Sequence, residues 1–252
     1  MIYRKIEDKY IVSFLICLAF VVRAVFLSQT DNEYGYEAVC RALFGIEWSK
    51  NPILVPNPAW PSMHFYIMGL FLKAWNNILL TPRVVSLLAG SLTILPYYFL
   101  LKILFDKKVA FYSSLILVFY HEHIRISITS LSEAPYLLFL ILALFYFFKY
   151  QDGRKMSYML LSSMWLNLAC FTRYEGWLFV FLLSMFLLYK KQWKILSVYL
   201  PLSLIAPLIW IFLVYLKTHM PFFFRMANLE HIRINMDYLN MGLQERSLVW
   251  FK

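Results

Sequence analysis

Acidic side chains directly after the first long apolar run have the type and position of a general base. The segment TDNEYGYEA contains Asp31 and Glu33, separated by Asn32. A carboxylate at the edge of an apolar phase can have a raised pKa, which makes it a usable base near neutral pH. We therefore take Asp31 and Glu33 as the candidate catalytic residues. The alternative, which stays open, is that both are solvated acids at a loop or helix start.

Two arginines in other polar segments have the chemistry of phosphate ligands. Arg125 lies in HEHIRISITSLSE, and Arg173 lies in TRYEG, inside the otherwise apolar stretch 156–189. A guanidinium binds two phosphate oxygens at once, so an arginine at membrane depth suits a phosphate attached to a lipid. We predict that Arg125 and Arg173 bind such a phosphate. The competing interpretation is that Arg173 and Glu175 form a structural ion pair that braces a helical hairpin.

Further polar and aromatic residues in the same segments could orient the arginines or contact an acceptor. The supporting candidates are His64, His121, Glu133 and Glu175. Of these, His64 could instead be an ordinary interface residue. Aromatic side chains that could stack on a sugar are Tyr34, Tyr36, Trp60 and Trp177, although such residues are common at membrane interfaces whatever the function. The His121-x-His123 spacing is a weak metal pattern, and no metal ligand is assigned.

The amino-acid composition indicates the environment of the chain that carries these segments. Hydrophobic residues make up 62% of the 252 residues and charged residues only 15%, whereas a soluble domain has about 25% charged residues. Several apolar runs reach about 17 residues, the length that crosses a bilayer core. The chain is therefore predicted to be an all-α, multi-pass integral membrane protein, with the lipid bilayer as its surroundings.

The basic residues between the apolar runs predict the orientation of the chain. The net charge of +10 is spread over short lysine and arginine patches, as expected for cytoplasmic loops, and it does not indicate nucleic-acid binding. With these patches inside, the N-terminus is cytoplasmic and the candidate site is extracytoplasmic. Seven transmembrane helices are expected, at about 10–28, 83–105, 109–124, 133–150, 156–172, 176–189 and 194–216.

The domain organisation follows from these spans. Residues 1–216 are expected to form one transmembrane module, with a large external loop at 29–82 that carries two amphipathic helices in the interface. These helices are EYGYEAVCRALFG and SMHFYIMGLFLKAW. Residues 217–252 are expected to form an external tail. The segments HEHIR and TRYEG are expected to be external turns.

Read in order, several segments resemble the glycosyltransferases of the GT-C fold, and in particular family 39, the protein O-mannosyltransferases and their bacterial lipid-modifying relatives. They are the acidic segment with EYGYEAVCRALFG, PAWPSMHFYIMGLF, PRVVSLLAGSLTILPYYFLLKILF, HEHIRISITSLSEAPYLLF and FTRYEGW, within residues 10–220. The resemblance implies a GT-C bundle and an inverting transfer of sugar from a polyprenyl-phosphate donor. It implies an acidic base in the first external loop, hence Asp31 or Glu33, and basic residues at the carrier phosphate.

The chain departs from the family pattern at two points. The two acids are not adjacent, and Asp31 is favoured because it heads the motif. Family members also continue beyond the seven spans, and three alternatives stay open for this chain: a minimal version, a fragment, or one half of a complex with a membrane partner subunit. The resemblance leaves open a divalent cation, Mg or Mn, and the identity of the acceptor. The alternative functions are a non-catalytic module of the same fold that binds polyprenyl lipids or a partner, and a transporter.

Overall fold

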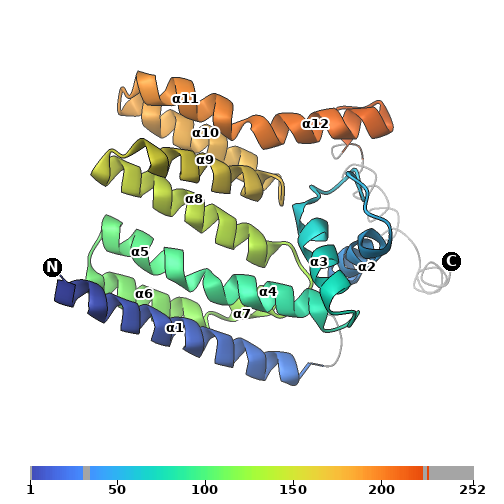
Figure 1. Ribbon diagram of the computed structural model, residues 1–252, viewed down its shortest axis with the longest axis horizontal. Helices are drawn as coiled ribbons and strands as arrows, with labels where there is room; N and C mark the ends of the chain where they lie inside the picture. Colours follow the sequence, from blue (N-terminus) through green and yellow to red (C-terminus); the bar gives the residue numbers. More distant parts are fainter. Residues whose placement is uncertain (1, 31–34, 224–225, 227–252) are drawn as a thin grey trace, which may run out of the picture.

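The structure is a computed structural model that describes residues 2–30, 35–223 and 226, and the secondary structure assigned within these residues is helical. Figure 1 shows the helices as a bundle with most axes running in the same direction or its opposite. The helices are α1 (Ile2–Ser28), α2 (Tyr36–Lys50), α3 (Met63–Ala74), α4 (Thr81–Leu92), α5 (Ile94–Leu104), α6 (Lys107–Phe119), α7 (His121–Ser127), α8 (Glu133–Gly153), α9 (Met156–Cys170), α10 (Glu175–Tyr189), α11 (Trp193–Ser203) and α12 (Ile205–Thr218).

In the described part of the chain, four helical stretches are long and apolar enough to cross a membrane. They are Asp8–Ser28, Thr81–Leu104, Glu133–Gly153 and Trp193–Thr218. The remaining apolar helices of the bundle, α6, α9 and α10, have 13, 15 and 15 residues, fewer than the ~20 of a comfortable crossing. The prediction of an all-α integral membrane protein is thus confirmed, whereas the count of about seven transmembrane helices stays a prediction.

Two of the four stretches are each interrupted once, and proline explains both interruptions. The helix breaks at Thr93 between α4 and α5, and at Leu204 between α11 and α12. Pro96 and Pro207 each follow the break by three residues. Because proline has no backbone N–H, it cannot bond the carbonyl four residues earlier, which weakens the helix at that point. Thr93 and Leu204 themselves keep right-handed helical backbone angles, so each stretch continues through its interruption.

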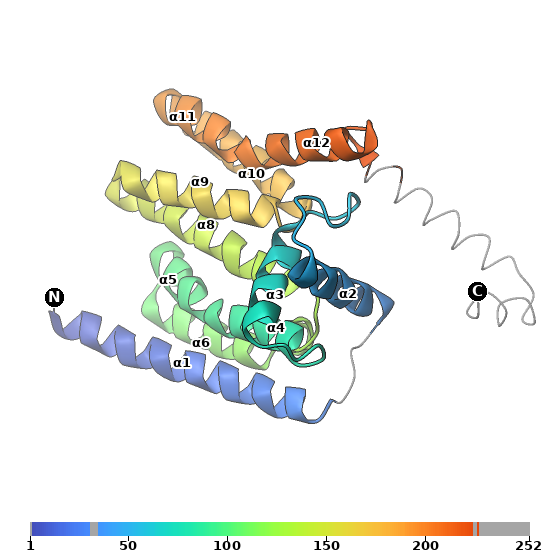
Figure 2. The ribbon, with the colours of Figure 1, turned by 45° about the vertical axis from the view of Figure 1, so that its right-hand side comes forward.

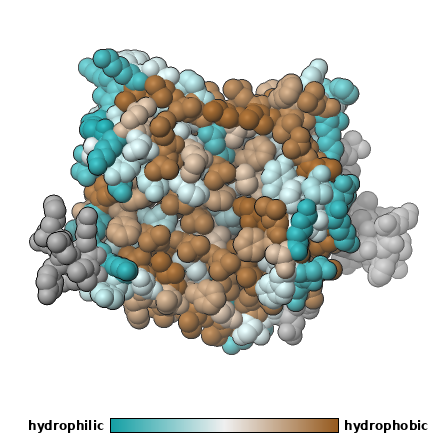
Figure 3. Space-filling view, in the orientation of Figure 1, coloured by the Kyte–Doolittle hydropathy of each residue, from teal (hydrophilic) through white to brown (hydrophobic). Residues whose placement is uncertain are grey.

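The outer surface of the bundle is apolar around its middle. Figure 3 shows hydrophobic residues across the centre of this face and hydrophilic residues at its two ends. Large apolar side chains such as Phe14, Ile116, Phe181 and Phe212 are more than half exposed. Exposing such groups to water costs about 25 cal/mol per Å², a cost that lipid removes. The face in Figure 3 therefore has the polarity profile of a membrane-spanning bundle.

The interior has two larger hydrophobic clusters, besides a small one at Val55, Trp210 and Val214. One hydrophobic cluster joins α8, α9, α10 and α11, with Phe147, Met159, Leu187 and Tyr199 at its centre. The other joins α1, α5 and α6. Figures 1 and 2 both show α2 and α3 together at the end of the bundle opposite the N-terminus. A Cβ on Gly69 of α3 would come within 2.2 Å of Trp48 Cε3 on α2, so the glycine permits this close contact.

The prediction for the region around residue 120 was wrong in detail. A single span over 109–124 followed by a loop at HEHIR was expected, but α6 ends at Phe119 and HEHIR begins the short helix α7. Tyr120 between them is extended. The cause is tertiary: Arg23 of α1, which is fully buried, donates from Nη2 to His123 Nδ1 at 2.5 Å and holds α7 against α1.

Candidate functional site

The predicted bases, Asp31 and Glu33, lie outside the described residues. In the sequence they stand between Thr30, which follows the last turn of α1, and Gly35, which precedes α2. Tyr34 lies outside the described residues as well. The described polar groups of the candidate site lie at the bundle end that carries α2, α3 and the turn between α9 and α10 (Figure 1).

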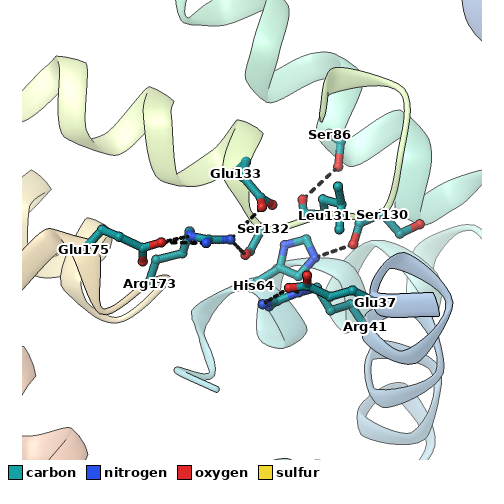
Figure 4. Close-up of polar contacts among 10 residues, drawn as sticks. All are labelled: Glu37, Arg41, His64, Ser86, Ser130, Leu131, Ser132, Glu133, Arg173 and Glu175. Atoms are coloured by element: carbon teal, nitrogen blue, oxygen red, sulfur yellow. Dashed lines mark hydrogen bonds and ion pairs between the residues drawn. The ribbon is translucent and has the colours of Figure 1, made fainter. Parts of the chain in front are cut away.

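Arg173 is the centre of a charged cluster in that turn. Its Nη1 lies 2.8 Å from Glu133 Oε1, and its Nη2 lies 2.6 Å from Glu175 Oε1. Nη1 also donates to Ser132 Oγ at 3.1 Å. Burial alone would lower the pKa of Arg173, but the two carboxylates outweigh it and raise that pKa, so the guanidinium stays charged. The structure thus brings together three of the predicted site residues (Figure 4).

A second arginine, which the sequence analysis did not single out, lines a cavity together with Arg173. Arg41 of α2 is only 4% exposed, and its Nε and Nη2 donate to Glu37 Oε1 at 2.9 and 2.7 Å. Its guanidinium lies over the Trp60 ring, 4.5 Å from the ring centre. Burial lowers the pKa of Arg41, although Glu37 opposes this effect. The signal in the sequence was the Glu37–Arg41 spacing of four residues, which places both side chains on one face of a helix.

His64 is buried beside these two arginines. It is fully inaccessible to solvent, and its Nε2 lies 2.9 Å from the carbonyl oxygen of Ser130. Since a carbonyl can only accept, Nε2 carries the hydrogen and Nδ1 is a free acceptor. Burial, and secondarily the charge of Arg41, lower the pKa of His64 to about 3. The imidazole is therefore neutral at physiological pH.

A polar cavity of about 270 Å³ lies between these elements. Both arginines line it, together with Glu37, Ala59, Trp60, Pro61, Thr172, Tyr174 and Glu175. Around the site, three buried polar atoms of the described residues have no hydrogen-bond partner: Arg41 Nη1, His64 Nδ1 and Glu133 Oε2. Such atoms are costly unless a ligand or water satisfies them. Arg41 offers a donor for an anion, and His64 and Glu133 offer acceptors for hydroxyl groups; Figure 4 shows how these three side chains converge.

The other predicted residues lie elsewhere. Arg125 and His121 are on α7 and do not line the cavity. Arg125 Nε donates to Glu122 Oε2 at 2.8 Å, and the His121 side chain is 83% exposed. Among the residues that the structure describes, no group of three metal-ligating side chains is close enough to hold an ion. Arg125 and His121 are thus not part of the cluster around Arg173.

The fold and the site together define an integral membrane protein with a charged, cavity-forming site at one end of its helix bundle. Residues 59–216 match the family model of the dolichyl-phosphate-mannose-protein mannosyltransferases, which is more than half of the 252 residues. The chain therefore belongs to this family, and the resemblance to family 39 of the GT-C glycosyltransferases is confirmed. No curated protein sequence matches the chain. The matched region includes Trp60, His64, Glu133 and Arg173.

Proposed function

We propose that this protein transfers a sugar, with inversion, from a polyprenyl-phosphate donor to an acceptor hydroxyl at the bundle end that carries α2 and α3. The observation that carries the proposal is the pair of arginines, Arg41 and Arg173, that line one cavity in a member of the mannosyltransferase family. Family membership supports a dolichyl-phosphate-linked mannose as the donor. The acceptor is left as a hydroxyl compound of unspecified class.

The two arginines suit the phosphate of the donor in different ways. Arg41 has an Nη1 without a partner, so it can donate to a phosphate oxygen without losing a contact. Arg173 has its nitrogens engaged, but Glu175 is 54% exposed and Glu133 only 29%. A phosphate oxygen can therefore replace Glu175 at lower cost, because water already solvates that carboxylate. Glu133 then remains as the residue that orients Arg173.

The chemical step is a single displacement at the anomeric carbon of the sugar. The acceptor oxygen forms a bond to this carbon while the bond from the carbon to the phosphate oxygen breaks. The acceptor proton passes to the carboxylate of Asp31, or alternatively of Glu33, and the polyprenyl phosphate leaves as an anion that the arginines stabilise. The acceptor oxygen attacks the anomeric carbon from the side opposite the leaving phosphate, and this single displacement inverts the configuration of that carbon.

The proposal is tested with purified protein in lipid nanodiscs and dolichyl-phosphate mannose, with water as the acceptor hydroxyl compound, by following the release of dolichyl phosphate by mass spectrometry. Asp31→Asn should abolish release while leaving insertion intact, since it removes a base and no packing group. Glu122→Gln, which removes an exposed carboxylate on α7, is the matched control and should keep the wild-type rate. Wild-type rates in Asp31→Asn, Glu33→Gln and the double variant would refute the assignment of the base.

Donor binding without release would instead favour the alternative function, a non-catalytic module that binds polyprenyl lipids or a partner subunit. The fully formed Arg173 ion pairs are compatible with such a module.

Release measured with and without added Mg²⁺ or Mn²⁺, after treatment with a chelator, would decide whether the reaction needs a divalent cation.

Seven spans and an extracytoplasmic site are part of the same proposal. The turns between α5 and α6, α8 and α9, and α10 and α11 lie at the same end as the N-terminus in Figure 1. Cysteines at Lys108, Arg154 and Lys190, in a background without native cysteines, should resist an impermeant maleimide in intact cells. A cysteine at Asn57 should react. Labelling of a cysteine at position 108, 154 or 190 from outside would contradict this topology.

A further inference from the structure

Arg83, the third residue of α4, is a buried cation outside the cavity. Only 4% of its surface is exposed, and no carboxylate among the described residues pairs with it. Its Nε donates to the carbonyl oxygen of Ile128 at 2.9 Å. Its Nη1 donates to the carbonyl oxygen of Thr30 at 2.8 Å, and Nη2 donates to Thr30 Oγ1. A charge this deep, near the end of a membrane-crossing stretch, is costly and calls for a function.

The Thr30 contacts fix the end of α1. The backbone N–H of Thr30 donates to the carbonyl oxygen of Leu27 at 3.2 Å, and Thr30 Oγ1 donates to the same oxygen at 3.1 Å. These bonds close the last turn of α1, and Arg83 then ties that turn to α4. Thr30 directly precedes Asp31 in the sequence. Arg83 thus holds Thr30, the residue directly before the acidic segment that begins with Asp31.

The Ile128 contact fixes the start of a second segment, residues 128–132, which connects α7 to α8. Its Ser130 carbonyl accepts from His64 Nε2 at 2.9 Å, and its Ser132 Oγ accepts from Arg173 Nη1 at 3.1 Å. Glu133, the partner of Arg173, follows at once. The segment therefore runs from Arg83 at one end to the Arg173 cluster at the other, and Figure 4 shows its contacts with His64 and Arg173.

We propose that Arg83 is a positioning residue for the transfer reaction. One guanidinium holds both the last turn of α1 and the 128–132 segment, and so fixes the approach to Asp31 relative to the arginines that bind the phosphate. This inference rests on the proposed function, with Asp31 as the base. Arg83 acts through the carbonyl oxygens of Thr30 and Ile128 and the Thr30 hydroxyl, and it touches neither the donor nor the acceptor, so its loss slows the chemical step without weakening donor binding.

The experiment measures kcat and the donor KM for release of dolichyl phosphate from dolichyl-phosphate mannose in nanodiscs. Arg83→Gln should lower kcat by about tenfold or more, the effect of losing hydrogen bonds from a charged group, with the donor KM changed less than about twofold. Arg83→Lys should retain an intermediate kcat. Thr30→Val keeps the buried arginine, removes only the hydroxyl contact, and should show a smaller fall in kcat.

The matched control is Ser86→Ala. Ser86 lies one helical turn beyond Arg83 and donates to the Leu131 carbonyl at 3.4 Å, so it touches the same segment but not Thr30. Its kcat should stay at the wild-type value. An equal fall in kcat for Ser86→Ala, a rise in donor KM for Arg83→Gln, or unchanged kcat in both Arg83→Gln and Thr30→Val would overturn the proposal.

Two patterns of assay results distinguish a failure of the positioning role of Arg83 from a failure of the proposed function. If Asp31→Asn is inactive but Arg83→Gln and Thr30→Val are normal, only the positioning role fails. If Asp31→Asn itself is fully active, the base assignment fails first. Arg83→Gln should also add little to a partly active Asp31→Glu variant, because both changes displace the same group; multiplied losses would show that Arg83 acts elsewhere.

Discussion

Arg173 Nη1 lies 2.8 Å from Glu133 Oε1, a contact that joins the turn between α9 and α10 to the first residue of α8. The same guanidinium contacts Glu175 at the start of α10. The two carboxylates thus orient the arginine from two helices. The ion pair within the turn and the phosphate-binding role are compatible, because the more exposed carboxylate can give way to a ligand.

Replacement of Arg173 distinguishes ligand binding from structural support. Arg173→Gln should raise the donor KM by about 10- to 100-fold, because a charge-assisted contact with phosphate is lost. Arg125→Gln is the control, since Arg125 is half-exposed on α7 and pairs with Glu122; its KM should not change. If Arg173→Gln lowers only the melting temperature in detergent, the ion pair is structural.

Arg41 and Glu37 should respond in opposite ways. Arg41→Gln should raise the donor KM by about tenfold, since it removes the unpartnered Nη1 that faces the site. Glu37→Gln keeps the arginine and removes its carboxylate partner, so the donor KM should stay the same or fall. The rate of dolichyl phosphate release as a function of donor concentration gives the KM of both variants. A KM that rises equally in the two variants would mean that the pair acts only as a structural unit.

Gly176 is required at the start of α10 for steric reasons. A Cβ there would lie 2.8 Å from the backbone N of Cys170 and 2.9 Å from its Cα, and backbone atoms cannot move aside cheaply. Gly176→Ala should therefore cost about 1–3 kcal/mol and displace Arg173. At Gly153 a Cβ would only touch Tyr158 Cε2 at 3.7 Å, so Gly153→Ala should be tolerated. Thermal unfolding in detergent and the donor KM compare the two; equal stability would contradict the steric argument.

His64 should make the protein sensitive to acid. Its pKa is lowered to about 3 in the folded state by burial, with Arg41 adding to the effect, whereas the unfolded chain has the ordinary value of about 6.5. Between these values only the unfolded state binds the proton, so stability is present above pH ~6.5 and falls as the pH drops toward ~3. The slope is of order 1 kcal/mol per pH unit.

The variant that tests the acid sensitivity is His64→Gln, which cannot titrate in this range. Its unfolding midpoint should depend less on pH between about 3 and 6.5 than that of the wild type. His121→Gln removes an exposed histidine and should behave like the wild type. A parallel pH dependence of wild type and His64→Gln would assign the acid sensitivity to other groups.

The sequence alone was sufficient for the class of protein and for part of the site. The apolar runs require a membrane environment and helical backbone, because lipid leaves no other way to satisfy N–H and C=O groups. The charges at 173 and 175 interrupt such a run, and a charge there needs a partner within reach. Arg173 and Glu175 were therefore recognisable as a pair, and Glu133 as a further candidate at the start of the earlier helix α8.

Only the tertiary structure decided which polar residues share a cavity. Arg41 and Arg173, which line the same cavity, are more than 130 residues apart in sequence, and no local pattern indicates that α2 packs beside the turn before α10. Arg125 and His121 looked equivalent to Arg173 in sequence, yet the Arg23–His123 contact draws α7 against α1, and both side chains are exposed away from the cavity. Periodicity and hydropathy fix which segments are helices, but the packing of helices depends on contacts between distant residues.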